Sequence, residues 1–313
     1  MSAAILKPGL QTTLQGHPRL GYRHMGMPYS GPADGLSAAL ANHLVGNAPG
    51  DTVLEITYGG LALTFDEPAW FALTGAPAAA SLNGASIQHH QTQHAPAGSS
   101  LQIDMARHGT RLYLAIAGGW IGETVLGSPS TYLPAGLGGH HGRALNAGDT
   151  LAIPPQPSTL PILTTPPDLR PHITESCLLR AYPSAEFAHL RAASQAALFD
   201  QAFHAGAQID RMGITLEGPP LAITTDGKMK SAAVFPGTVQ CPKNGQPIIL
   251  LPDAQTTGGY PRIANIARCD QHLLGQIRPG SKVQLLRRSA EAALKDYDEK
   301  SALIGKWLPN YRL

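Results

Sequence analysis

The sequence is poor in charge and has no long apolar run. Charged residues make up 14% of the 313 positions, the formal net charge is +2, and the basic residues form no cluster. We therefore expect no nucleic acid and no anionic membrane surface as a partner. The longest strongly apolar run, Leu112–Gly122, is too short to cross a bilayer, and the N-terminus lacks the pattern of a signal peptide. These absences predict a cytoplasmic protein.

Cysteine and the common catalytic motifs are also scarce. The three cysteines, Cys177, Cys241 and Cys269, are odd in number and have no metal-knuckle or CxxC spacing, so we expect buried, reduced thiols. The chain has no GxxxxGK[ST], no GxGxxG after a strand, no HExxH and no GxSxG. A P-loop enzyme, a Rossmann dehydrogenase, a zincin and a nucleophile-elbow hydrolase are therefore disfavoured. Any catalysis must use scattered polar residues that the fold brings together.

Glycine and proline, in contrast, are abundant. The 34 glycines and 27 prolines are about a fifth of the chain, which favours many turns and a β-rich fold. The length suggests about two domains. Residues 154–171 contain seven prolines and no helical period, which is typical of a linker. We therefore predict an N-terminal half over 1–153, a C-terminal half over 172–288, and a peripheral helical tail over 289–313.

The first half contains one clear helix signal. Leu36, Leu40 and Leu44 recur every four residues and form one apolar stripe. Asp34 precedes this stripe and is suited to cap the helix, while Asn42 lies in its interior. Both polar residues are candidates for a functional role. The alternatives are a cap for Asp34 and a hydrogen bond to a neighbouring loop for Asn42.

The next segment changes to the alternating pattern of strands. Residues 53–65 alternate around Gly59-Gly60, and this pattern predicts a hairpin. Glu55 falls among apolar residues, so it is either exposed on one face or buried with a partner.

Histidines and one arginine are further candidates in the first half. His89, His90 and His94 are close in sequence, but the surrounding turn residues favour a solvated loop over a metal site. His141 and Arg143 follow a Gly-Gly pair and are candidate ligand contacts.

The second half is predicted to mix one helix with several strands. A helix is expected from Ser184 to Gly206, and two strands are expected within 231–251, joined by a turn at 243–245. Asp210 and Arg211 enter another turn.

The most unusual stretch is QTTGGYPRIAN, residues 255–265. Two hydroxyls and a Gly-Gly pair follow an apolar run that predicts a buried strand. Such a segment suits an anion, a carbonyl or a ureido-like group. A tight turn between strands is an equal alternative. The candidate binding residues here are Thr256, Thr257, Gly258, Gly259 and Tyr260.

Ten segments, taken together and in order, resemble a known family. They are GYRHMGMPYSGPAD, ANHLVGN, LEITYGG, LTGA, YLAIAGG, LGSPSTY, GGHHGRAL, DRMGITLEG, GTVQCP and TTGGYPRIA. The chain resembles the family of 5-oxoprolinase C subunits, which is also described as allophanate-hydrolase subunit 2-like or as the kinase-inhibitor antagonist family. It is similar as well to half of the biotin-dependent carboxyltransferase domain of urea carboxylase. The resemblance spans roughly residues 8–285.

The resemblance implies a mainly β fold with α+β additions, in two cyclophilin-like β-barrel halves. It implies a B-subunit homologue as partner, in a heterodimer or heterotetramer, together with a separate A subunit. The implied reaction is the ATP-dependent opening of 5-oxo-L-proline to L-glutamate, with Mg accompanying the ATP and the chain inactive alone. In the urea-carboxylase relatives the corresponding surface handles carboxybiotin.

Roles for individual residues follow as hypotheses, because phosphorylating a lactam oxygen needs N–H groups, hydroxyls and a cation near the phosphates. The threonines and glycines of 256–259 would supply N–H and hydroxyl groups. Arg211 or Arg143 would supply positive charge, and Asp34 or Asp210 a base or metal ligand. Asn42, Glu55, Gln240 and Tyr260 complete the candidate binding set.

The chain departs from the family pattern at three places. Gly16 replaces an expected carboxylate, Tyr182 begins a segment expected to read Gly-Pro-Gln, and Lys230 stands where an acidic or polar residue is expected. Three functions therefore stay open. They are one component of a 5-oxoprolinase-type complex, a carboxyltransferase half acting on a urea-like or small amide acceptor, and a regulatory protein that sequesters its partner.

Overall fold

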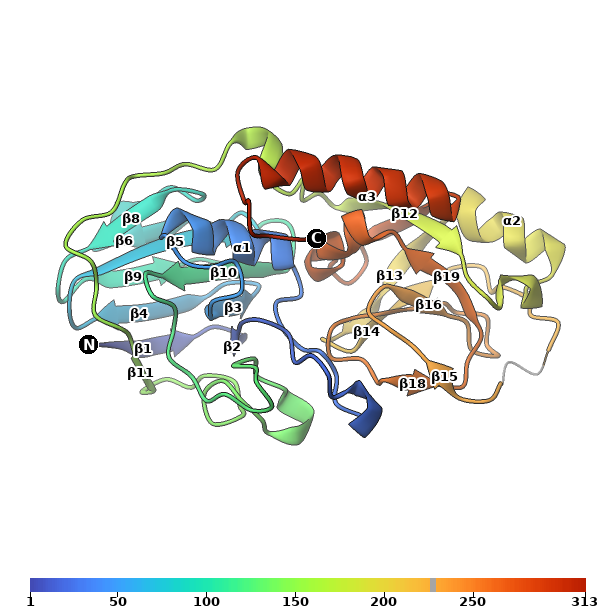
Figure 1. Cartoon of the computed structure of the whole chain (residues 1–313), viewed down its shortest axis with the longest axis horizontal. Coiled ribbons are helices and arrows are strands. Elements are labelled where there is room, and N and C mark those ends of the chain that lie inside the picture. Colours follow the sequence, from blue (N-terminus) through green and yellow to red (C-terminus); the bar gives the residue numbers. More distant parts are fainter. Residues whose placement is uncertain (226–228) are drawn as a thin grey trace. The chain divides into compact units, whose positions relative to one another are not determined.

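The computed structural model describes residues 1–225 and 229–313, which divide into two compact units. The first comprises 1–20, 30–173 and 304–312, and the second comprises 21–29, 174–303 and 313. Strands dominate both units (Figure 1), so the expectation of a mainly β fold is confirmed.

The first unit contains two antiparallel sheets. The strand order of the six-stranded sheet is β11 (Thr150–Ala152), β1 (Ser2–Pro8), β4 (Leu61–Phe65), β9 (Ser100–Ile103), β6 (Ala80–Leu82) and β7 (Ala85–Ser86). The order of the five-stranded sheet is β2 (Gln11–Gln15), β3 (Val53–Thr57), β10 (Arg111–Ile116), β5 (Ala69–Gly75) and β8 (Thr92–Ala95).

The core of the first unit lies between these two sheets. Leu63 and Phe65 from the six-stranded sheet share one buried cluster with Phe71 and Leu112 from the five-stranded sheet. Side chains alternate along a strand, so Tyr113 lies on the other face of β10, in a second buried cluster with residues of α1 (Gly35–Leu44). The helix thus covers the outer face of the five-stranded sheet.

Helix α1 forms as its sequence predicts. Leu36, Leu40 and Leu44 are all buried. Asp34 caps the helix, because its Oδ1 accepts a hydrogen bond from the backbone N–H of Ser37 at 2.9 Å. The helix therefore begins where the capping residue and the apolar stripe place it.

The predicted hairpin over residues 53–65 is wrong. Strands β3 and β4 belong to different sheets, so the chain crosses from one sheet to the facing one. Gly59 and Gly60 make this crossing with φ of 91° and 79°. The alternating pattern could not reveal it, because a strand that returns within its sheet and one that crosses to the facing sheet alternate alike.

The second unit is a closed barrel. Its strand order is β12 (Ser176–Pro183), β19 (Arg262–Ile266), β16 (Thr238–Gln240), β17 (Ile248–Leu250), β14 (Gly213–Glu217), β13 (Ala202–Ile209) and β20 (Lys282–Arg287). A parallel pairing of β12 with β20 closes the ring. The predicted pair of strands within 231–251 is confirmed by the antiparallel pairing of β16 and β17. Outside the ring, β15 (Ala232–Ala233) pairs with β18 (Thr257–Gly258).

The helix predicted from Ser184 to Gly206 is only partly present. One 3-10 turn, η4 (Phe187–His189), is followed by α2 (Ala192–Asp200), and the chain then enters β13. Phe203 and Gly206 therefore lie in a strand, and Phe203 is buried in the barrel core. Phe203 matches the period of the expected helix by coincidence, because a single buried position in a strand can fall on a helical period.

The remaining short elements are 3-10 turns. They are η1 (Arg23–Met25), η2 (Leu133–Ala135), η3 (Pro167–Leu169) and η5 (Arg268–Gln276).

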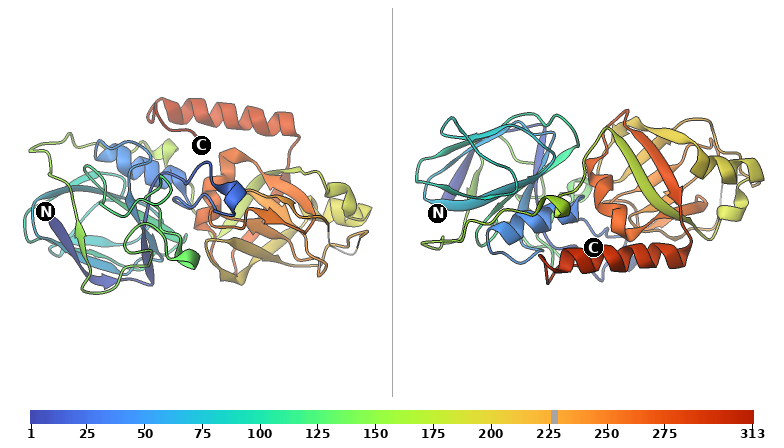
Figure 2. Two further views of the ribbon diagram at one scale, coloured as in Figure 1. Left: turned by 60° about the horizontal axis from the view of Figure 1, so that its bottom comes forward. Right: turned by 90° about the horizontal axis from the view of Figure 1, so that it is seen from above.

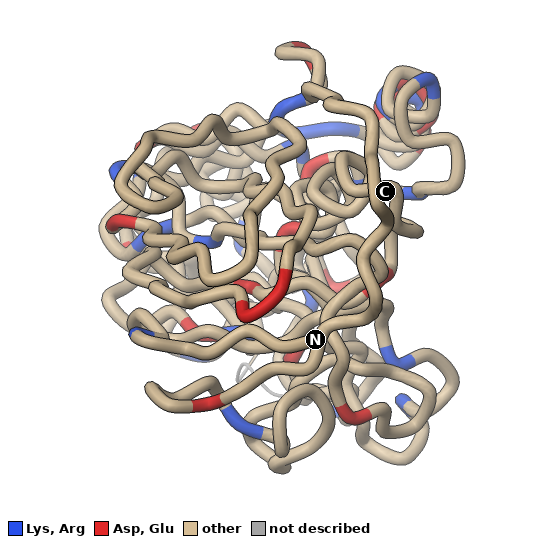
Figure 3. The backbone as a smooth tube through the Cα atoms, turned by 90° about the vertical axis from the view of Figure 1, so that its left-hand side faces the viewer, with Lys and Arg blue, Asp and Glu red and all other residues tan. Residues whose placement is uncertain are grey.

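Helix α3 (Ala290–Gly305) is the C-terminal helix that the sequence predicts (Figure 2). In the second unit its Ala293 packs against Ala267 and Cys269. Within residues 1–225 and 229–313, no helix is both long enough and apolar enough to cross a membrane. Figure 3 shows acidic and basic residues scattered along a mostly uncharged chain, as the composition indicates.

Candidate functional site

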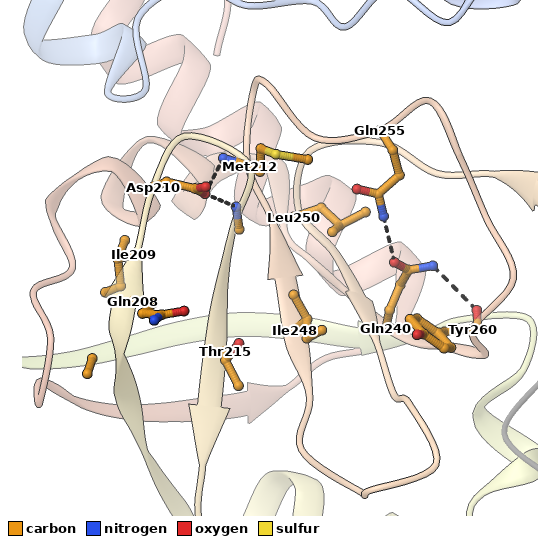
Figure 4. A pocket seen from close by; sticks show the side chains of 12 residues that line it. Gln208, Ile209, Asp210, Met212, Thr215, Gln240, Ile248, Leu250, Gln255 and Tyr260 are labelled. Atoms are coloured by element: carbon orange, nitrogen blue, oxygen red, sulfur yellow. Dashed lines mark hydrogen bonds between the residues drawn. The ribbon is translucent and has the colours of Figure 1, made fainter. Parts of the chain in front are cut away.

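A pocket of about 610 Å³ opens on the second unit (Figure 4). Its walls come from β13, β14, β16 and β17 and from the segment that follows β17. It is lined by Ala207, Gln208, Ile209, Asp210, Met212, Gly213, Thr215, Gln240, Ile248, Leu250, Gln255 and Tyr260.

The alternation of side chains places this pocket on the outside of the barrel. On β14, Ile214 belongs to the barrel core while its neighbour Thr215 lines the pocket. On β17, Ile249 belongs to the core and Ile248 lines the pocket. Successive side chains of a strand point to opposite faces, so the pocket lies on the face that points away from the core.

Two glutamines and a backbone carbonyl form a chain of hydrogen bonds on one wall. Gln255 Nε2 donates to Gln240 Oε1 at 3.1 Å, and Gln240 Nε2 donates to the carbonyl oxygen of Tyr260 at 3.5 Å (Figure 4). A Cβ atom at Gly258 would lie 2.3 Å from Gln240 Nε2, so the glycine allows the amide to approach the backbone. Gly258 thus allows another group to approach the backbone closely.

Asp210 directly follows β13 and lies at the far side of the pocket from Gln240 (Figure 4). Its Oδ1 accepts hydrogen bonds from the backbone N–H groups of Met212 at 2.7 Å and Gly213 at 3.2 Å, which fixes the predicted turn. The next residue, Arg211, points into the protein. Its guanidinium is buried and pairs with Asp253 at 2.7 Å. Asp210 therefore lines the pocket, whereas the charge of Arg211 is paired with a buried carboxylate.

The 256–259 stretch lies beside the pocket and does not line it. Thr256 is buried, and its carbonyl oxygen accepts hydrogen bonds from Val234 N at 3.1 Å and from the Arg23 guanidinium at 3.4 Å. Thr257 pairs with Ala233 across the two-stranded sheet. Of the candidates in and around this stretch, the structure brings together Asp210, Gln240 and Tyr260 at one pocket, and it places residues 256–259 outside the lining.

Three candidate residues of the first unit make contacts that stabilise the helix and strands of that unit. Asp34 caps α1, and Asn42 Nδ2 donates to the carbonyl oxygen of Asp51 at 2.8 Å. Glu55 is buried, its Oε2 accepts a hydrogen bond from Tyr113 Oη at 2.9 Å, and its Oε1 lies 3.2 Å from Arg111 Nε. Burial raises the pKa of Tyr113 well above its usual range, and the negative charge of Glu55 raises it further.

Arg143 forms an ion pair with a carboxylate, as Arg111 does with Glu55. Its two terminal nitrogens donate to Asp149 at 2.7 and 2.8 Å. These hydrogen bonds hold the pKa of Asp149 well below its usual range. His141 pairs with Glu123 at 2.9 Å, so both ligand candidates of this loop have acidic partners.

The histidine group is not arranged as a metal site. His94 lies on β8 and packs against the Trp70 ring, with ring centroids 4.5 Å apart. His90 is buried, and burial lowers its pKa to about 3. Among residues 1–225 and 229–313, no three His, Cys, Asp or Glu side chains are placed to hold a metal ion.

The three departures have different surroundings. A Cβ at Gly16 would lie 2.6 Å from the Pro129 ring, so a side chain there would require the neighbouring loop to move. Tyr182 packs beside Ala267 and Ala293, away from the pocket lining. Lys230 is exposed.

Sequence reasoning missed several pocket residues, among them Gln208, Thr215 and Gln255. Gln255 is the first residue of the unusual stretch 255–265. A single amide side chain in a turn matches no functional motif, so the sequence offered no reason to choose it. Thr215 could have been found from the alternation of β14, where Ile214 and Leu216 identify the inner face.

The comparison with known proteins now identifies the family. The family model described as "Carboxyltransferase domain, subdomain A and B" matches residues 25–287. The chain belongs to this family. The C subunit of 5-oxoprolinase from Escherichia coli (strain K12) is 40% identical over 296 residues, which is 93% of each chain. The corresponding C subunit from Haemophilus influenzae is 35% identical over 291 residues, again 93% of each chain.

The carboxyltransferase fold is also found in a solved structure. The Kluyveromyces lactis urea amidolyase matches with a TM-score of 0.91 and 25% identity, over 98% of this chain and 20% of that one. This carboxyltransferase-family chain thus corresponds to about a fifth of that larger protein.

Proposed function

We propose that this chain is the C subunit of an ATP-dependent 5-oxoprolinase-type complex, which opens 5-oxo-L-proline to L-glutamate. The observation that carries the proposal is the 40% identity to the C subunit of the Escherichia coli 5-oxoprolinase, because it extends over 93% of both chains. The chain would work with homologues of the B and A subunits of that enzyme, and would be inactive alone.

The role of this chain in the reaction would be to hold and orient the substrate. A lactam resists water because of amide resonance, and activation of its oxygen by ATP makes it a better electrophile. The amides of Gln240 and Gln255 and the carboxylate of Asp210 are suited to hold and orient a small amide in the barrel pocket. The described lining does not fit the phosphates of ATP, because it contains no lysine, arginine or histidine. We therefore assign no step of nucleotide chemistry to this pocket.

ATP hydrolysis by the assembled complex tests the proposal. The purified chain is mixed with its B-subunit and A-subunit homologues, and phosphate release is measured with and without 5-oxo-L-proline. We expect turnover that 5-oxo-L-proline stimulates and that is lost when this chain is omitted. A stable complex whose ATP hydrolysis ignores 5-oxo-L-proline would contradict the proposal.

A carboxyltransferase half is the second candidate. The TM-score of 0.91 to the urea amidolyase structure favours it. Carboxybiotin on a partner would then donate its carboxyl group to a small nitrogenous acceptor. Consumption of carboxybiotin by the chain and its partner, without any ATP hydrolysis dependent on 5-oxo-L-proline, would favour this function over the first.

A further inference from the structure

One carboxylate oxygen of Asp210 is engaged within the chain and the other is not. Oδ1 accepts hydrogen bonds from the backbone N–H groups of Met212 and Gly213, at 2.7 and 3.2 Å. Within residues 1–225 and 229–313, Oδ2 takes part in no hydrogen bond and no salt bridge. The side chain is exposed and lines the barrel pocket. The turn therefore fixes this carboxylate while leaving one oxygen for a group from outside the chain.

The described part of the chain offers no cation for this carboxylate. Asp210 has the one charged side chain among the residues that line the pocket. The next residue, Arg211, is turned to the buried Asp253, with 2.7 Å between Nε and a carboxylate oxygen. Arg262 on β19 is bound to Glu186 at 2.6 Å. A positive group that pairs with Asp210 would therefore come from another molecule.

The rest of the lining suits a long cationic side chain. Ile248 and Leu250 form an apolar surface in the middle of the pocket (Figure 4). Lysine and arginine side chains lie along such a surface with their aliphatic stems and keep their charged ends at a polar group. Met212 is 39% exposed and Tyr260 is 43% exposed. Methionine and tyrosine are enriched where proteins bind one another, so this lining has the character of an interface.

The unpaired carboxylate is also unfavourable for the proposed reaction. 5-Oxo-L-proline carries a carboxylate at neutral pH, and a second negative charge in the pocket would repel it. A basic residue bound to Asp210 would remove this repulsion. The C subunits to which this chain is similar are components of a larger enzyme, so the proposed complex contains a second polypeptide that supplies such a residue.

We infer that Asp210 is the docking point for a lysine or arginine side chain of the B-subunit homologue, which enters the barrel pocket and cancels its negative charge. The inference rests on the proposed function, which supplies the partner. It places the interface on the outer face of the barrel, over β13, β14 and β17, and it assigns a basic residue to the partner.

The affinity between the two chains tests this. The full chain is titrated with its B-subunit homologue by isothermal calorimetry, at low and at high ionic strength. Asp210→Asn keeps an oxygen that accepts the two hydrogen bonds of the turn, and it removes the charge. We expect the Kd to rise at least about tenfold, and to depend less on salt, because one member of an interfacial charge pair is lost. Asp210→Lys should weaken binding further, since like charges would then meet.

Two more variants separate the pocket from the general charge of the surface. Glu217→Gln is the matched control, because Glu217 is an exposed acid of β14 that does not line the pocket. It removes the same charge, and its Kd should stay within about threefold of that of the unchanged chain. Thr215→Phe keeps the charge of Asp210 and fills part of the pocket, so it should weaken binding as Asp210→Asn does. Circular dichroism checks that each variant is folded.

Four results would overturn the inference. They are an unchanged Kd in Asp210→Asn, an equal loss in Glu217→Gln, full affinity in Thr215→Phe, and no complex between the unchanged chains. Dimerisation of this chain alone that Asp210→Asn abolishes would assign the pocket to a second copy and would also overturn it. Failure of the proposed function looks different. In that case the two chains would bind with an affinity that depends on Asp210, while the complete complex would show no ATP hydrolysis stimulated by 5-oxo-L-proline.

Discussion

Tyr113 Oη lies 2.9 Å from Glu55 Oε2, and the two residues are directly opposed on β10 and β3. The same hydroxyl accepts a hydrogen bond from the backbone N–H of Asp34 at 2.8 Å, and Glu55 accepts one from Ala33 N, also at 2.8 Å. Two buried side chains of one sheet therefore hold the turn from which α1 starts.

Removing this hydroxyl should destabilise the protein. Tyr113→Phe leaves Glu55 and the Asp34 N–H each without one partner in a buried site, so we expect the free energy of unfolding to fall by about 1–3 kcal/mol. Urea denaturation followed by circular dichroism measures it. Tyr260→Phe is the control, because Tyr260 accepts the hydrogen bond from Gln240 with its backbone carbonyl. Equal stability of the two variants would contradict the prediction.

The Arg211–Asp253 pair should behave as a structural ion pair. Asp253 is 2% exposed, so Arg211→Met leaves a buried charge without its partner, and we expect a loss of about 3–5 kcal/mol in the free energy of unfolding. The double variant Arg211→Met, Asp253→Leu should recover part of that loss. If Arg211→Met instead kept its stability and lost only turnover, Arg211 would be a functional cation.

Gly258 should matter to binding more than to folding. In Gly258→Ala the new Cβ would lie 2.3 Å from Gln240 Nε2, which is the end of a side chain and can move away. We expect affinity for 2-pyrrolidinone to fall about threefold to tenfold, the value of one neutral hydrogen bond, with little change in the melting temperature. Gly305→Ala is the control, since a Cβ there meets no atom within 4 Å. An unchanged affinity in Gly258→Ala would remove Gln240 from the binding wall.

Acid should weaken the fold through two buried histidines. Burial lowers the pKa of His90 and of His272 to about 3. The unfolded chain binds protons on these residues below pH 6.5 or so, whereas the folded chain keeps them neutral. The free energy of unfolding should therefore fall as the pH is lowered from about 6.5 towards 3, by at most about 1.4 kcal/mol per pH unit for each histidine.

Substitution separates the two contributions. His272→Gln should reduce the pH slope of the free energy of unfolding, measured by urea denaturation at several pH values. His24→Gln, at an exposed position, should leave the slope as it is. If both variants kept the full slope, other groups would be responsible for the acid sensitivity.

Local sequence patterns were sufficient to predict an element whose structure depends only on its own residues. Helix α1 follows from three leucines and the cap at Asp34, and all four positions act within one short segment. The partners of the strands depend on distant residues. Nothing within residues 53–65 shows that β3 pairs with β10 and that β4 pairs with β1.

The pocket depends even more on distant residues. Gln240, Gln255 and Asp210 come from three separate segments, and their meeting requires the register of β16, β17 and β14 and the irregular register of β13. The sequence could nominate Asp210, Gln240 and Tyr260 through the family resemblance. It could not exclude Arg211, because a turn residue and its neighbour look alike until the direction of each side chain is known.

The parallel pairing of β12 with β20 has a consequence for how the protein is made. Both neighbours of β12, β19 and β20, lie far downstream of it in the sequence. A nascent chain that has left the ribosome as far as residue 260 therefore exposes β12 with neither neighbour, and its apolar inner face is open to aggregation. The second unit can complete its ring only after Lys282–Arg287 has been synthesised, so we expect chains truncated before Lys282 to require chaperones and to accumulate as insoluble protein.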